Sequence, residues 1–161
     1  MLGDSRMIIR KYRSKDFARL YEIDHAAFSP GIAYSHLELQ FYVRCRRCTT
    51  RVAEDDGEVV GFAIGCSEPP NLGHLITIDV VPHRQRQQIG SRLLTDIENW
   101  LWETGARMIY LETAIDDTGA RGFYERHDYF VFEELERYYN NEVSAFVMVK
   151  TTKRRRPTPR S

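Results

Sequence analysis

Short runs of apolar residues that alternate with polar ones predict β-strands along most of the chain. The runs are rich in Val, Ile, Phe and Thr, and two of them flank Asp56-Gly57, a dipeptide typical of tight hairpins. The predicted strands are MIIRKY (7–12), TTRVAED (49–55), EVVGFAIGC (58–66), HLITIDVV (74–81), RMIYLET (107–113), YFVFEEL (129–135) and VSAFVMVK (143–150).

Apolar residues with a spacing near 3.6 predict helices between these strands. The first helix begins at Ser14, a candidate N-cap, and a second spans about 35–44. A third starts near Gly90 and stops before Gly105, and TGARGFYERH (118–127) forms a short fourth. The apolar positions that we expect to face the core are Phe17, Leu20, Tyr21 and Phe28 in the first helix, Leu37, Leu39 and Phe41 in the second, and Ile89, Leu93, Leu94, Ile97 and Leu101 in the third.

Strands before, between and after the helices indicate one α/β domain with a mixed sheet, which we place at residues 1–150. The crossover from 74–81 to 107–113 favours a parallel pair of strands. A chain of 161 residues with 42% apolar composition can bury one core, and its apolar runs are too short to span a membrane. The first residues lack the apolar stretch of a signal peptide, so we expect a cytoplasmic protein, either a monomer or a homodimer.

The formal net charge of zero conceals a basic end of the chain. Residues 151–161 carry five positive charges, which leaves the rest of the chain at about −5 (0 − 5). Two prolines and the run of like charges predict a disordered, solvated tail. Such a tail could contact nucleic acid or the ribosome, but we favour a tail without such a partner.

The chain has three cysteines, Cys45, Cys48 and Cys66, and this small and odd number does not suit a disulfide framework. The first two form a CxxC motif, yet a zinc site would need two more ligands at matching spacing. A redox CxxC opens a helix directly after a strand, whereas this one follows a helical pattern and precedes a strand. We therefore expect neither a metal site nor a redox function.

The stretch DVVPHRQRQQIGSRLL (79–94) has the strand–loop–helix layout of a phosphate-binding turn. Backbone N–H groups between Arg86 and Gly90 would point into the turn at the start of a helix, where the macrodipole favours an anion. Gln85, Arg84 and Arg86 add donors and positive charge suited to a diphosphate. A single glycine fits neither a Walker A loop nor a dinucleotide GxGxxG loop, so an ordinary strand–helix connection stays open as an alternative.

Two motifs in the right order resemble those of the GNAT N-acetyltransferase superfamily. The family's Q/R-x-x-G-x-G/A loop reads Gln85-Arg86-Gln87-Gln88-Ile89-Gly90 in this chain. Its N-x-x-A-x-x-F/L-Y helix reads Asp117-Thr118-Gly119-Ala120-Arg121-Gly122-Phe123-Tyr124, and the likeness extends over residues 7–150. The resemblance implies a GNAT fold, with a mixed, mostly antiparallel sheet of about seven strands, about four flanking helices and a splay between strands 4 and 5.

The resemblance implies acetyl-CoA as the cofactor and CoA as the product. The diphosphate would lie on the 85–90 loop, and the pantetheine arm would run along the fourth strand where it splays from the fifth. The implied contacts are Ile78, Asp79 and Val80 on the strand, Gln85, Arg86, Gln87, Gln88, Ile89, Gly90 and Ser91 at the loop, and Asp117, Ala120 and Tyr124 on the later helix. Asp79 is expected to act through its backbone.

Three positions depart from the family pattern. Gln88 replaces the first loop glycine, at a cost of about 1 kcal/mol if the position requires a positive φ. Asp117 replaces an asparagine and so brings an anion to the cofactor contact. Asp128 replaces a glycine beyond the expected cofactor contacts.

Acetyl transfer to an amine requires a neutral nucleophile, a donor for the oxyanion and a proton for the departing thiolate. By the resemblance, Tyr124 donates that proton and a backbone N–H near Val80 holds the oxyanion. Glu112 on the fifth strand is a candidate base, and His74 at the start of the fourth could share or relay the proton. Whether Glu112, His74 or a water chain is the base stays open.

The chain is most similar to the RimI-like branch of the family, which acetylates protein N-termini. The resemblance implies a peptide groove with Tyr138 and Tyr139 on one side, Phe28 and Tyr34 on the other, and His74 facing the acceptor. An α-amine with a pKa of about 7.8 is roughly 14% neutral at pH 7, and a lysine amine of about 10.4 is roughly 0.04% neutral. Two alternatives remain, acetylation of a small amine (a polyamine, an amino acid or an antibiotic) and a CoA-binding regulatory module without turnover.

Overall fold

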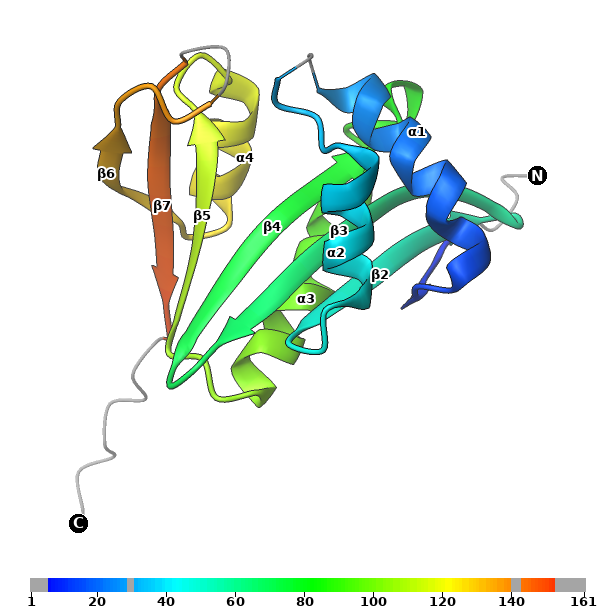
Figure 1. Cartoon of the computed structure of the whole chain (residues 1–161), viewed down its shortest axis with the longest axis horizontal. Coiled ribbons are helices and arrows are strands. Elements are labelled where there is room, and N and C mark those ends of the chain that lie inside the picture. Colours follow the sequence, from blue (N-terminus) through cyan, green and yellow to red (C-terminus); the bar gives the residue numbers. More distant parts are fainter. Residues whose placement is uncertain (1–5, 29–30, 140–142, 153–161) are drawn as a thin grey trace.

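The computed structural model describes residues 6–28, 31–139 and 143–152. It shows an α/β fold in which one seven-stranded sheet carries helices on both faces (Figure 1). The strands are β1 (Ile8–Lys11), β2 (Cys48–Asp55), β3 (Glu58–Glu68), β4 (Leu72–Val80), β5 (Met108–Ala114), β6 (Phe130–Leu135) and β7 (Ala145–Thr151). The helices are α1 (Phe17–Ala27), α2 (His36–Arg44), α3 (Ile89–Glu103) and α4 (Thr118–Arg126).

The sheet runs in the order β1-β2-β3-β4-β5-β7-β6, and β4 and β5 form its parallel pair. Their pairing covers three residues of each strand, Leu72–His74 against Met108–Tyr110. Beyond His74 the two strands diverge, and the sheet opens into a V (Figure 1). β5 pairs along its whole length with β7 instead. The mixed sheet, the parallel pair and the splay predicted from the sequence are confirmed.

The core lies between the β1–β4 part of the sheet and the helices on its two faces. In Figure 1, α1 and α2 cover one face of this part and α3 covers the other. The predicted stripe of α3 is fully buried, because its apolar side chains recur on the one face that meets the sheet. These buried side chains are Ile89, Leu93, Leu94, Ile97 and Leu101.

The start of the first helix differs from its prediction. Ser14 begins a 3-10 turn, Ser14–Asp16, and α1 follows from Phe17. Asp16 fixes this turn, since its Oδ2 accepts the Arg13 N–H at 2.8 Å and pairs with Arg10 at 2.8 Å. The side chain that organises the helix start is therefore Asp16 rather than Ser14.

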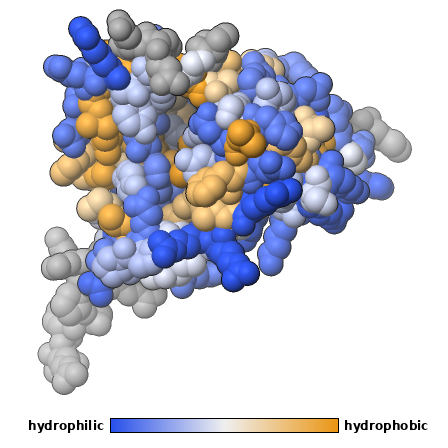
Figure 2. Space-filling model, in the orientation of Figure 1, coloured by the Kyte–Doolittle hydropathy of each residue, from blue (hydrophilic) through white to orange (hydrophobic). Residues whose placement is uncertain are grey.

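The second helix buries a different face from the one predicted. Leu37 and Phe41 are 76% and 65% exposed, while Leu39 is fully buried. Residues two positions apart point to opposite sides of a helix, so Leu39 cannot share a face with the other two. Figure 2 shows the resulting apolar surface over α2.

The cysteines also differ from expectation, since Cys48 and Cys66 form a disulfide. They lie directly opposite each other in the β2–β3 pair, and Cys45 is a free thiol. Their pairing depends on the register of the hairpin, which the CxxC spacing does not reveal.

Some predicted features lie outside the described residues, namely the tail beyond Thr152 and parts of the 28–34 loop and the 138–142 turn. Among the described residues, no helix has the length and apolar character needed to cross a membrane.

Truncation of Leu39 and of Leu37 tests the orientation of α2. We expect Leu39→Ala to lower the free energy of unfolding by about 2–4 kcal/mol, because it removes a fully buried side chain. The matched variant Leu37→Ala should change it by less than about 0.5 kcal/mol. Urea unfolding of both variants provides the measurement, and a larger loss for Leu37→Ala would contradict this orientation.

Candidate active site

The splay of β4 from β5 leaves one edge of β4 without a partner strand. The Val81 N–H donates to the Val60 carbonyl of β3 at 2.9 Å, and backbone groups of alternate residues point to opposite edges of a strand. Val81 and Asp79 therefore direct their backbone groups to β3, and Ile78 and Val80 direct theirs to the open edge. The backbone groups that can reach a ligand at the open edge are therefore those of Ile78 and Val80, and not those of Asp79.

The loop after β4 adopts the backbone conformation of an anion-binding turn. Arg86 and Gln88 have φ values of 64° and 63°, in the left-handed region that favours glycine. The first helical bond of α3 runs from the Arg92 N–H to the Gln88 carbonyl at 3.1 Å. The N–H groups of the preceding first-turn residues, 89–91, therefore have no acceptor in the helix and can bind an anion.

The side chains around this turn differ in whether they already have a hydrogen-bond or ion-pair partner. Arg84 pairs with Asp55 at 2.5 Å and donates to Gln87 at 2.7 Å, so its charge is already compensated. Gln85 donates through Nε2 to the Val80 carbonyl at 3.2 Å and so ties the loop to β4. Arg86 is exposed and has no ion pair within the described part of the chain.

The two ends of α4 explain two departures from the family pattern. The Asp117 side chain accepts the Ala120 N–H at 2.9 Å and so caps the helix. Asp128, just after the helix, has a φ of 70°, which is why a glycine suits that position. Asp117 therefore caps the helix as an asparagine would, but it carries a negative charge.

Tyr124 on α4 has a partly buried phenol that stays protonated. The partly buried ring packs against Phe123 and Tyr129, and its hydroxyl has no hydrogen-bond partner among the described residues. Burial raises the pKa of the Tyr124 phenol, and negative charge at Asp117 raises it further. The phenol therefore stays protonated throughout the neutral range.

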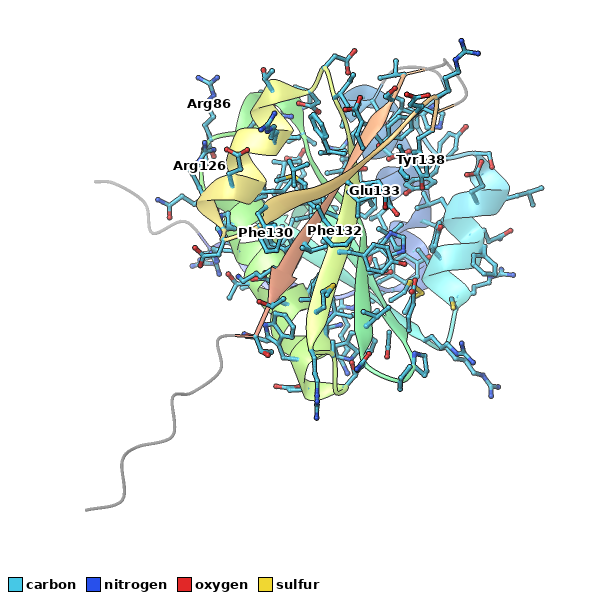
Figure 3. All side chains as sticks on the ribbon, turned by 90° about the vertical axis from the view of Figure 1, so that its left-hand side faces the viewer. Arg86, Arg126, Phe130, Phe132, Glu133 and Tyr138 are labelled. Atoms are coloured by element: carbon cyan, nitrogen blue, oxygen red, sulfur yellow. A yellow bond between two sulfur atoms is a disulfide. The ribbon has the colours of Figure 1, made fainter. Side chains whose placement is uncertain are left out.

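A cavity of about 250 Å³ lies where β4 and β5 diverge. It is lined by Gly31, Ile32, Tyr34, Glu38, Tyr42, His74, Ile76, Glu112, Tyr138 and Tyr139. Five of the predicted residues are thus brought together, while Phe28 is outside the lining and ends α1 as its C-cap. In the view of Figure 3, Tyr138 and Arg86 lie on opposite sides of β6, so the cavity and the anion-binding turn are at two different faces.

His74 and Glu112 form a hydrogen-bonded pair at the point where the strands part. His74 Nε2 lies 2.7 Å from Glu112 Oε2, and both side chains are less than a fifth exposed. His74 Nδ1 is 3.4 Å from Glu68 Oε1, and the imidazole stacks on Tyr110 with ring centroids 4.2 Å apart. The imidazole is therefore held in place from three sides.

Sequence reasoning missed several residues of this site. Glu68 and Tyr110 support His74, and the Tyr110 hydroxyl donates to Glu68 at 2.5 Å. Tyr110 lies two residues before Glu112, so strand alternation would have placed both on one face. Asp24 was missed as well, because nothing in the helical pattern of α1 sets it apart from a solvent-facing residue.

Comparison with known proteins connects this geometry with acyl transfer. Residues 17–129 match the model of the acetyltransferase (GNAT) family. An uncharacterized N-acetyltransferase of Methanocaldococcus jannaschii is 36% identical over 145 residues, covering 89% of this chain and 91% of that protein. The N-alpha-acetyltransferase 30 of Schizosaccharomyces pombe is 28% identical over 118 residues, covering 70% and 78%. The ribosomal-protein-S18-alanine N-acetyltransferase of Escherichia coli is similar in structure, with a TM-score of 0.81, 22% identity and coverage of 90% and 93%.

Replacement of Gln88 tests the anion-binding turn. We expect Gln88→Gly to bind CoA more tightly, by up to about fivefold, since removing the Cβ lets the backbone approach a phosphate more closely. Calorimetric titration with CoA measures the change. The matched variant Gln87→Gly, one residue outside the left-handed position, should show no such gain. If Gln88→Gly bound CoA no more tightly than the parent chain, this account of the loop would lose its support.

Proposed function

Since the chain belongs to the acetyltransferase (GNAT) family, we propose that this N-acetyltransferase acts on the N-terminal α-amine of a protein or peptide. The observation that carries the proposal is the His74–Glu112 pair, which faces a cavity walled by tyrosines where β4 and β5 part. One of the similar proteins is an N-alpha-acetyltransferase by name, and another is named as an alanine N-acetyltransferase of ribosomal protein S18. The acceptor amine would enter through this cavity.

The residues at the opposite face suit acetyl-CoA, which supplies the activated acetyl group when bound. The free N–H groups of residues 89–91 and the uncompensated Arg86 would hold its diphosphate. The outward backbone groups of Ile78 and Val80 would hold the pantetheine as an added strand. The Val80 N–H is also the donor best placed to stabilise negative charge on the acetyl oxygen.

Tyr124 holds the proton for the leaving thiolate. Its raised pKa keeps the phenol protonated in the free protein, so a proton is present when the thiolate departs. Its hydroxyl has no hydrogen bond within the described residues, so it is available for that transfer.

The His74–Glu112 pair removes the proton from the attacking amine. The short hydrogen bond between them lets Glu112 orient the imidazole, so the two act as one base. Glu38 and Glu112 make the cavity acidic, and no lysine or arginine is among the described residues that line it. An amine that arrives as a cation is therefore attracted, and an acidic first residue is disfavoured.

A thiol-release assay with acetyl-CoA tests the proposed acceptor. The panel comprises peptides with free N-termini, N-blocked peptides that contain lysine, and polyamines. We expect release with free N-termini and much less with the N-blocked peptides, because the α-amine is far more often neutral at pH 7. Turnover of polyamines alone would favour a small-amine acetyltransferase. Tight CoA binding without turnover of any acceptor would favour a regulatory module.

Replacement of Tyr124 tests its role as the acid. We expect Tyr124→Phe to lower kcat by about 100-fold, in the range of a lost general acid, with little change in CoA affinity. Steady-state kinetics and CoA titration provide the two measurements. Tyr21→Phe, on the remote helix α1, should leave both unchanged. An unaltered kcat in Tyr124→Phe would remove the phenol from the mechanism.

A further inference from the structure

Two aspartates are buried together beneath the acceptor cavity, and the proposed chemistry uses neither of them directly. Asp24 on α1 is 0% exposed and Asp79 on β4 is 1% exposed. Among the described residues, neither carboxyl has a cationic partner. Burial of a carboxylate without a cation is costly, so a compensating interaction is required.

The contacts of the two carboxyls show what that interaction is. Asp24 Oδ2 accepts the Tyr34 N–H at 2.7 Å, and Asp79 Oδ1 accepts the Thr77 hydroxyl at 2.5 Å. The two remaining oxygens, Asp24 Oδ1 and Asp79 Oδ2, are fully buried, and no group in the described part of the chain donates a hydrogen bond to either. The two side chains are within hydrogen-bonding reach of each other. Two carboxyl oxygens can form a hydrogen bond only if one of them carries a proton.

Electrostatics assigns that proton to Asp79. Burial raises the pKa of the Asp79 carboxyl well above its ordinary value, and the hydrogen bond with Asp24 and its negative charge raise it further. The Thr77 hydroxyl acts in the opposite direction but is the smallest contribution. Like-charged carboxyls in a dry site commonly share one proton in this way.

The pair connects α1 and β4 to a wall of the acceptor cavity. Tyr34, held through its N–H by Asp24, donates its hydroxyl to the Ile76 carbonyl at 3.2 Å and packs edge-on against Tyr42. Both Tyr34 and Ile76 line the cavity. The titratable and polar groups that face the pair are Thr77 from β4, Tyr34 from the segment before α2 and Tyr124 from α4.

We propose that Asp24 and Asp79 share one proton, and that this proton fastens Tyr34 and its side of the acceptor cavity to β4. The two aspartates are then positioning residues for acyl transfer, which rests on the proposed function of the cavity. Loss of the proton at alkaline pH would bring two negative charges into contact, separate α1 from β4 and release Tyr34. The acceptor KM would rise with pH, while CoA affinity, set at the other face, would change little.

Three variants separate this role from a general effect on folding. Asp79→Asn keeps a donor for Asp24 at every pH, so its acceptor KM should stay near that of the parent chain without an alkaline rise. Asp79→Ala removes the donor, and we expect its acceptor KM to rise by about tenfold or more already at pH 7, since small misplacements at a site have large effects. Asp56→Asn, in the exposed β2–β3 turn, is the matched control and should behave as the parent chain.

Two readouts on the full chain do not depend on turnover. Carbon-13 NMR of the aspartate carboxyls should show one resonance that titrates far above the others and is absent from Asp79→Asn. Hydrogen exchange of the Tyr34 amide should be slow in the parent chain and in Asp79→Asn, and faster in Asp79→Ala. If every aspartate carboxyl titrated in the ordinary range, the shared proton would be excluded.

The kinetic and spectroscopic results together test the positioning role of the aspartate pair separately from the proposed acceptor. An Asp79→Ala variant with the acceptor KM and Tyr34 exchange of the parent chain would overturn the positioning role. If no acceptor were turned over while the NMR and exchange results were as expected, the proposed acceptor would be wrong and the proton-sharing pair would stand.

Discussion

The limited pairing of β4 with β5 is the constraint on which the rest of the structure depends. The two strands share only the pairs from Leu72–Met108 to His74–Tyr110, and beyond them β5 continues beside β7 alone. The N–H groups of Ile78 and Val80 at this edge of β4 are therefore left for a ligand. The same divergence creates space between the two halves of the sheet, and the candidate catalytic side chains surround that space.

The two faces of this opening carry charges of opposite sign. Free N–H groups and Arg86 lie at the face where α3 begins, and acidic groups, chiefly Glu112 and Glu38, line the other face. An anionic donor and a cationic acceptor would thus approach from opposite sides and meet near Tyr124. The buried pair of Asp24 and Asp79 lies below this meeting point, where an added negative charge would act on both the phenol and the cavity wall.

The fold and much of the site could be predicted from the sequence, because they depend on local patterns. The succession of strands and helices along the chain followed from apolar periodicity and family motifs, and the strained conformation of Gln88 followed from the glycine that it replaces. The exposed face of α2, the Cys48–Cys66 bond and the Asp24–Asp79 contact could not be predicted in this way. Each depends on how an element is rotated or aligned against a neighbour distant in sequence, and one chain without its packing does not contain that information.

Amide hydrogen exchange in the presence of CoA shows whether the open edge of β4 binds the cofactor. We expect slower exchange at Ile78 and Val80 and in the first turn of α3 when CoA binds. The Asp79 amide, which faces β3, should be unaffected by comparison. Tight binding of CoA without protection of Ile78 and Val80 would contradict the account, since the cofactor would then lie away from the splay.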